Sequence, residues 1–123
     1  MEENILTTIK KMTGIEEDLD AFDSDIMVFI NSAFSTLNQL GAGPPQGFAI
    51  VDGSECWDDY SKDLVLIGFV KTYIATRVKK TFDPPASTAL LKAMDETVDE
   101  LTWRIIVQLE TTAVKPEPPA IEN

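Results

Sequence analysis

The chain has 123 residues, of which 44% are hydrophobic and 25% are charged. This length suits one domain with its own hydrophobic core, and the composition is that of a folded protein, not of a disordered one. Twenty-one acidic residues against ten basic ones give a net charge of −11 at pH 7. That charge excludes retention on DNA, RNA or anionic lipid by the net field, because Lys and Arg must neutralise phosphates to hold those partners.

The sequence contains no histidine and one cysteine, Cys56. Without histidine, the chain lacks the commonest general base, the usual catalytic triads and most zinc sites. An internal disulfide would need a second cysteine. We therefore interpret Cys56 as a half-buried small hydrophobe and not as a nucleophile.

Membrane insertion is not expected. No uncharged apolar run approaches the roughly 18 residues of a membrane-spanning helix, and Glu2 and Glu3 stand where a signal peptide would be basic. We expect a soluble protein that is made and kept in the cytoplasm.

A short amphipathic helix is predicted for residues 3 to 12 because apolar side chains recur there at helical spacing. Lys10 and Lys11 fall in its last turn, where cations oppose the helix dipole, and Gly14 would close it. The apolar residues are Ile5, Leu6, Ile9 and Met12.

Residues 15 to 25 form an acidic connection, which we expect Ile15, Leu19 and Phe22 to pin to the core. Three of its carboxylates superficially suggest a calcium loop; these are Asp18, Asp20 and Asp23. The pattern lacks the glycine of the sharp turn and the glutamate of the twelfth position, so we prefer a solvated connection to a metal site.

The clearest amphipathic helix runs from a cap at Ser24 or Asp25 to about Leu40. A loop rich in glycine and proline follows at 41 to 47. Residues 48 to 51 are too few for a helix and precede the turn pair Asp52 and Gly53, so we expect a short strand or an extended packed segment there. A strand would need a partner, which could come from another copy of the chain.

A long central helix is predicted for residues 64 to 82, preceded by a short helical turn that Ser54 would cap. Its first seven residues carry no charge, so we expect other elements on more than one side of it. Its second half is amphipathic, and Pro84 and Pro85 end it. The basic residues of that half are Lys71, Arg77, Lys79 and Lys80.

A final helix, capped by Ser87 or Thr88, is predicted to pack against the central one. Its apolar seam consists of Leu91, Met94, Val98, Leu101 and Ile105. Trp103 lies off this seam, so one flank could meet a partner, or Trp103 could stack on Arg77 across the two helices. Glu100 and Arg104 are spaced for an ion pair. The carboxylates Asp95, Glu96, Asp99 and Glu100 are interpreted as an exposed face and not as a catalytic pair.

These elements predict an all-α fold, a small bundle of about four helices around the long central helix. We assign residues 1–110 to a helical domain and 111–123 to a Pro-rich, flexible and disordered tail. No constellation for catalysis or for a cofactor emerges, so the prediction is a protein that is not an enzyme.

Several short motifs follow one another in a set order. They are Ile9 to Gly14 with Ile15, Phe22 with Asp23, Ile30 to Ala33, Leu40 with Gly41, Gly43 with Pro44, Trp57, the long helix, Phe82 to Pro85, and Glu100 with Trp103 and Arg104. In this order the chain resembles, over about residues 4 to 106, the head-tail connector (adaptor) proteins of long-tailed bacteriophages and prophages of Gram-positive bacteria.

The resemblance implies an all-α subunit that forms a ring, typically of twelve copies, below the portal protein in the neck of the virion. The ring would extend the DNA channel, let DNA pass without specific binding, and give the next neck or tail-completion protein a docking surface. Before assembly the protein would reside in the host cytoplasm. In such families the C-terminal segment commonly reaches toward the portal; here the matching stretch, 113 to 123, is Pro-rich and acidic, which is a departure.

A basic helix end in an acidic protein makes the molecule electrically two-sided, and two-sided subunits associate head to side, as rings do. The candidate subunit or portal contacts are Lys71, Arg77, Lys79, Lys80, Phe82, Asp83, Pro84, Pro85, Phe48, Ile50, Val114, Pro116, Pro118 and Pro119.

Two other functions remain open at the level of the sequence. An acidic DNA mimic or inhibitor would occupy the basic site of a host enzyme, and a pull-down that recovers a nucleic-acid enzyme would favour it. A helical protein-interaction module of a bacterial regulator would be encoded beside regulatory genes and not beside portal and capsid genes.

Overall fold

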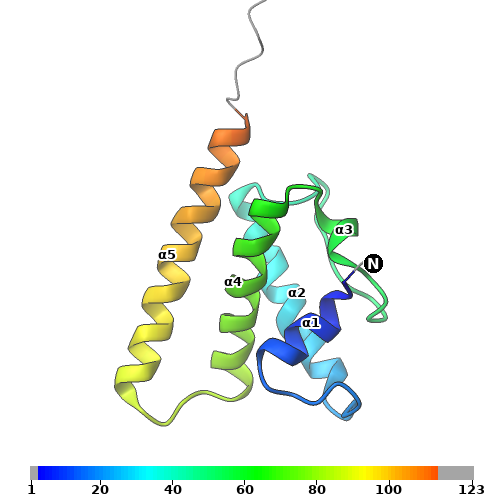
Figure 1. Ribbon diagram of the computed structural model, residues 1–123, viewed down its shortest axis with the longest axis vertical. Helices are drawn as coiled ribbons and strands as arrows, with labels where there is room; N and C mark the ends of the chain where they lie inside the picture. The colour runs from blue at the N-terminus through cyan, green and yellow to red at the C-terminus, as the bar shows by residue number, and fades with distance from the viewer. Residues whose placement is uncertain (1–2, 114–123) are drawn as a thin grey trace, which may run out of the picture.

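The fold is described for residues 3–113 of a computed structural model. Figure 1 shows its helices in chain order; they are α1 (Ile5–Met12), α2 (Asp23–Leu40), α3 (Trp57–Tyr60), α4 (Leu64–Phe82) and α5 (Thr88–Ala113). The described part of the chain contains no strand, which confirms the predicted all-α bundle. None of its helices combines the length and the apolar character needed to cross a membrane.

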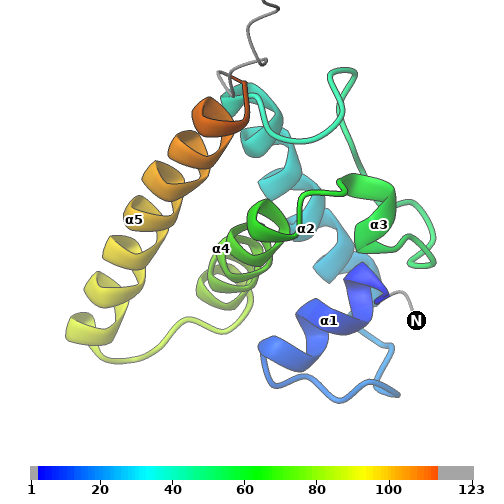
Figure 2. The same cartoon turned by 45° about the horizontal axis from the view of Figure 1, so that its top comes forward.

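The central helix α4 has the predicted bounds, and the other helices are arranged around it. Asp63 caps its start, where the carboxylate Oδ1 accepts hydrogen bonds from the N–H groups of Val65 and Leu66 at 3.1 and 3.2 Å. Figures 1 and 2 show α4 between α5 on one side and α1, α2 and α3 on the other. The Phe82 end of the helix stops two residues before Pro84, which cannot continue it.

The hydrophobic core lies between α1, α2 and α4. Its largest fully buried side chains are Phe34, Ile5, Ile9, Ile26, Ile30, Leu37, Ile74, Ile105, Val70 and Val78. Helix α5 supplies only Ile105 to this set, while Val98, Leu101 and Leu109 pack against the core half-buried. The predicted seam of α5 therefore exists, but α5 lies against α4 as an outer helix with one covered stripe.

The expectation that the first half of α4 is covered on more than one side is wrong for its first turn. Leu64 is 81% exposed and Val65 55% exposed, and Gly68 and Thr72 continue this open side along the helix. The reason is geometric: α5 covers one flank of α4 and α1 with α3 the other, so the side between these flanks has no neighbour within residues 3–113.

Of the two alternatives predicted for residues 48 to 51, the strand is absent and the packed segment is found, with Ile50 buried and Phe48 against the core. The side-chain amide of Asn31 on α2 bonds both backbone groups of Ile50, with Oδ1 accepting from the N–H at 2.8 Å and Nδ2 donating to the carbonyl at 2.9 Å. Asn31 thus does what a neighbouring strand would do. Pairing of Ile50 with another copy of the chain is not required to satisfy its backbone.

The short helix α3 is tied to the first helix through Trp57. The indole Nε1 of Trp57 donates to the hydroxyl of Thr8 at 3.1 Å, and the backbone N–H of Trp57 donates to the carbonyl of Glu3 at 3.0 Å. The cap of α3 is Cys56 and not Ser54 as predicted, because the Asp59 carboxylate accepts from the Cys56 N–H at 2.9 Å.

Lys10, in the last turn of α1 as predicted, is only 3% exposed. Its ammonium group donates to the carbonyls of Glu17 and Leu19 at 3.0 and 2.8 Å and to the Asp23 carboxylate at 2.8 Å. Each of the three N–H groups has an acceptor, so the buried charge is compensated.

This ammonium group holds residues 15–25 in place together with Ile15, which packs against the core, and Phe22, which meets Phe82. The predicted role of Ile15 and Phe22 agrees with these contacts, although Phe22 is 42% exposed, whereas Leu19 is 43% exposed and is not among the residues that pack against the core. The start of α2 moves accordingly: Asp23 is its first residue, Phe22 is its N-cap, and no side chain caps it, whereas Ser24 or Asp25 was predicted to do so.

Replacing Lys10 by Met should lower the free energy of unfolding by about 3 kcal/mol, because two carbonyls and the Asp23 carboxylate lose their common donor. Urea unfolding followed by circular dichroism measures the change. Lys11→Met is the matched control on the same helix; since Lys11 is exposed, its substitution should change stability by less than about 0.5 kcal/mol. Equal stabilities for the two variants would contradict the assigned role of Lys10.

Candidate assembly surfaces

The predicted basic group on α4 does not form one open cationic patch, since its members have partners within the subunit. Lys79 pairs with Asp83 at 3.0 Å along the end of the helix. Lys80 forms an ion pair with Asp95 and so links α4 to α5. The charge of this helix end is therefore largely balanced at short range.

The two remaining basic residues lie nearer the start of α4. Lys71 forms an ion pair with Glu3 and lies 5.6 Å from the centre of the Trp57 ring. Arg77 donates from Nη1 to the Tyr73 hydroxyl at 3.2 Å. The predicted contact between Arg77 and Trp103 is absent from the described fold, because Arg77 turns to Tyr73 on its own helix.

The corner that follows α4 is divided between core and surface. The Phe82 ring meets the Phe22 ring at 5.3 Å between centroids, edge to face, and Phe29 at 6.5 Å, so Phe82 holds the end of α4 against α2. Asp83 and Pro84 are exposed. Within this corner, these two residues are accessible to a neighbouring subunit.

Phe48 and Ile50 contribute to the packing of their own subunit. The half-buried Phe48 ring contacts Phe34 and Tyr60 at centroid distances of 5.0 and 5.3 Å. Ile50 is buried, so its side chain is not a contact in the folded subunit. The predicted contacts Val114, Pro116, Pro118 and Pro119 lie outside the described residues.

The outer face of α5 carries the most exposed aromatic side chain described. Trp103 is 58% exposed, and Val107 is exposed four residues later on the same side of the helix. Acidic residues flank them, including Glu100, which forms the predicted ion pair with Arg104 at 3.4 Å. The position of Trp103 off the apolar seam was the signal for this surface in the sequence, and an exposed tryptophan within a polar rim is typical of contact surfaces.

A second exposed apolar side chain, which the sequence did not indicate, is Leu64 at the start of α4, beside the charged residues Glu3, Asp58 and Lys62. A depression of about 590 Å³ beside it is bordered by Trp57, Ile67 and Lys71, between α3 and α4. The exposure of Leu64 could not be read from periodicity, because its neighbours in sequence are apolar on every side of the helix.

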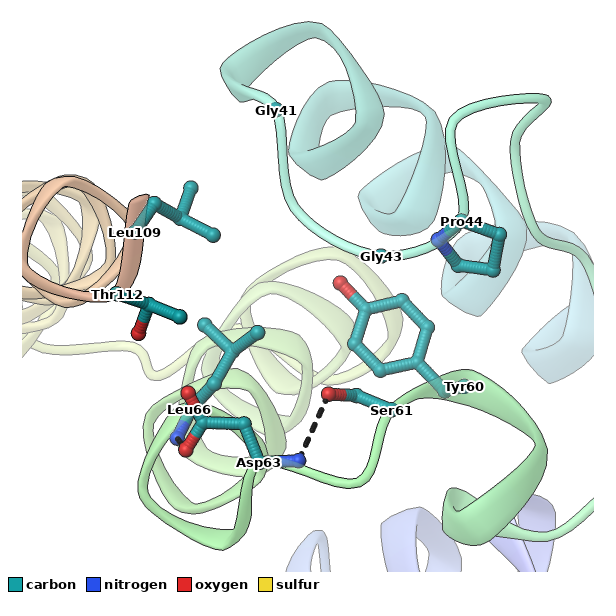
Figure 3. A pocket seen from close by; sticks show the side chains of 9 residues that line it. All are labelled: Gly41, Gly43, Pro44, Tyr60, Ser61, Asp63, Leu66, Leu109 and Thr112. Atoms are coloured by element: carbon teal, nitrogen blue, oxygen red, sulfur yellow. Dashed lines mark hydrogen bonds between the residues drawn. The ribbon is translucent and has the colours of Figure 1, made fainter. Parts of the chain in front are cut away.

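A pocket of about 330 Å³ lies between the start of α4, the end of α5 and the loop that follows α2 (Figure 3). Gln108 on α5 donates to the Asp63 carboxylate at 3.0 Å, and this bond, aided by the backbone donors of Val65 and Leu66, holds the pKa of Asp63 below its usual range. The carboxylate is therefore charged at neutral pH. It both caps α4 and joins the two long helices.

Tyr60 forms the inner wall of this pocket directly beneath Gly43. Gly43 has φ +85°, and a Cβ atom there would lie 2.5 Å from Cε1 of Tyr60. Glycine is needed at this position for two reasons, the left-handed backbone and the close approach of the ring. Burial raises the pKa of Tyr60, so its hydroxyl remains protonated at neutral pH.

Within residues 3–113, no three His, Cys, Asp or Glu side chains are grouped so that they could hold a metal ion. The carboxylates Asp18 and Asp20 are exposed, and Asp23 is bonded to Lys10.

Gly43→Ala should lower the free energy of unfolding by at least about 2 kcal/mol, because alanine meets both the left-handed backbone and the Tyr60 ring. Thermal or urea unfolding provides the measurement. Gly68→Ala is the control: Gly68 lies in α4 with no atom within 4 Å of a new Cβ, so this variant should gain about 0.5–1 kcal/mol. Opposite signs are expected for the two substitutions, and a neutral Gly43→Ala would contradict the close packing on Tyr60.

A family model described as "Phage connector protein" matches residues 5–112, from the first residue of α1 to the last turn of α5. A search of curated proteins found no match. A search of solved structures also found none.

Proposed function

The chain belongs to the phage connector protein family, a family of structural proteins, and from this premise we propose that it is a head-tail connector that forms a ring below the portal. The ring extends the DNA channel and presents a docking surface to the next neck or tail-completion protein. The match over nearly the whole described chain carries the proposal.

The surfaces of the subunit support association through two different patches, as a ring requires. One is the outer face of α5 around Trp103 and Val107. The other is the end of α4 with the exposed Asp83 and Pro84, where Lys79 and Lys80 retain donors toward a neighbour. These patches differ in chemistry, so each contact joins unlike surfaces and each copy can use both.

The charge of the subunit supports passage of DNA without binding. The net charge is −11, and all four basic residues predicted as contacts on α4 have acidic or tyrosine partners at short range. A channel lined by such a surface repels phosphates and releases no counterions on contact with DNA.

The isolated protein should be a monomer or a weak oligomer, because subunits of equal charge repel one another and the portal supplies the template for the ring. Light scattering of the purified chain, alone and with purified portal protein, tests this. The expected result is a larger assembly only with the portal. A tight dimer at micromolar concentration would argue strongly against the proposal.

Lys79→Glu together with Lys80→Glu should weaken assembly on the portal while the fold is retained, since both side chains are about 40% exposed. Co-sedimentation with the portal measures assembly, and circular dichroism checks the fold. The double variant Lys11→Glu, Lys62→Glu is the control, with the same change in net charge at exposed positions outside the two patches. Equal assembly of both double variants would leave the end of α4 with a structural role only.

A further inference from the structure

The pocket in Figure 3 contains a buried hydrogen-bond donor without an acceptor. Tyr60 is 4% exposed, and its hydroxyl has no hydrogen-bond partner within the described part of the chain. Figure 3 shows the ring reaching from α3 under Gly43, with the hydroxyl directed toward the space that Leu66, Leu109 and Thr112 border. A buried phenol hydroxyl that makes no hydrogen bond costs free energy. A segment that brings an acceptor into the pocket therefore gains binding free energy by removing that cost.

The remaining walls of the pocket define what kind of segment fits it. Pro44, Leu66 and Leu109 are apolar, and the Asp63 carboxylate adds one negative charge. An aromatic ring, apolar walls and a hydroxyl donor are the features that bind polyproline segments, whose backbone carbonyls have no internal partners. The carboxylate adds a preference for a segment that also carries a cation.

The chain itself supplies such a segment next to the pocket. Thr112 borders the pocket, and the residues that follow Ala113 are Val114, Lys115, Pro116, Glu117, Pro118 and Pro119. Lys115 is the only basic residue after Arg104. Because a chain spans at most about 3.6 Å per residue, Pro116 lies within roughly 14 Å of Thr112 in any conformation. The tether keeps this segment at high effective concentration beside the site.

We propose that residues 114–119 bind the pocket of their own subunit, with a backbone carbonyl accepting from the Tyr60 hydroxyl and Lys115 beside Asp63. The proposal concerns the single subunit and does not depend on ring formation. It gives the Tyr60 hydroxyl an acceptor. It also explains why the segment after α5 is rich in proline.

The Tyr60→Phe substitution in the full chain tests the hydroxyl directly. If the hydroxyl donates to the segment, its removal lowers the urea midpoint of unfolding. In a full chain with Ser at positions 115, 116, 118 and 119, Tyr60→Phe should no longer lower the midpoint, because the altered segment no longer holds a carbonyl against the hydroxyl. A Tyr60→Phe variant that raises the midpoint of the natural chain, or the same effect in both backgrounds, would overturn the proposal.

Nuclear magnetic resonance of the ¹⁵N-labelled full chain locates the contact. The four serine substitutions should shift the amide resonances of Gly41 and Gly43, which are remote in sequence, and leave those of Gly14 and Gly68 in place. Ile121→Ser, beyond the proposed segment, is the matched control and should shift none of them. Unchanged Gly41 and Gly43 resonances would refute binding at this pocket. Shifts that disappear on dilution would show that the segment binds another copy and would overturn the assignment to its own subunit.

Discussion

The fold depends on one buried charge, the ammonium group of Lys10. Without it, the carbonyls of Glu17 and Leu19 in the acidic connection 15–25 would lose the donor that draws them to α1. Because the third acceptor is Asp23, the first residue of α2, the same group fixes where α2 starts and how it lies against α1. A solvated, negatively charged segment thus becomes a defined corner of the bundle through three hydrogen bonds at one nitrogen.

A second constraint, the Asp63 carboxylate, organises the other side of the molecule. It accepts from the first turn of α4 and from Gln108 on α5, so the helix cap and the joint between the long helices are one group. Helix α5 also packs along α4: Ile105 is its one fully buried side chain in the described chain, Val98, Leu101 and Leu109 are half-buried against the core, and Lys80 bonds it near its start. An outer helix held in this way leaves its far face free for a partner.

The sequence predicted those features that local rules determine. Pro84 defines the end of α4, and the apolar spacing of α2 and α5 defines their inner faces. It could not predict features that depend on a partner remote in sequence: the burial of Lys10 by three acceptors, or the pairing of Ile50 with the Asn31 amide. Periodicity also tells which residues share a face but not whether that face is covered, and for this reason Leu64 was expected inside and lies outside.

Charge and exposed apolar surface act in opposite directions in this subunit. Each copy carries −11, and the basic residues described on α4 are engaged with acidic or tyrosine groups, so copies that approach one another gain little from charge and lose by repulsion. Attraction must then come from apolar contact, for which Trp103 and Val107 are available. An apolar contact of modest area does not overcome both this repulsion and the entropy lost on association. A fixed template that aligns many copies removes most of that entropic cost, and this is the physical argument behind the proposal that the connector assembles on a portal and not in free solution.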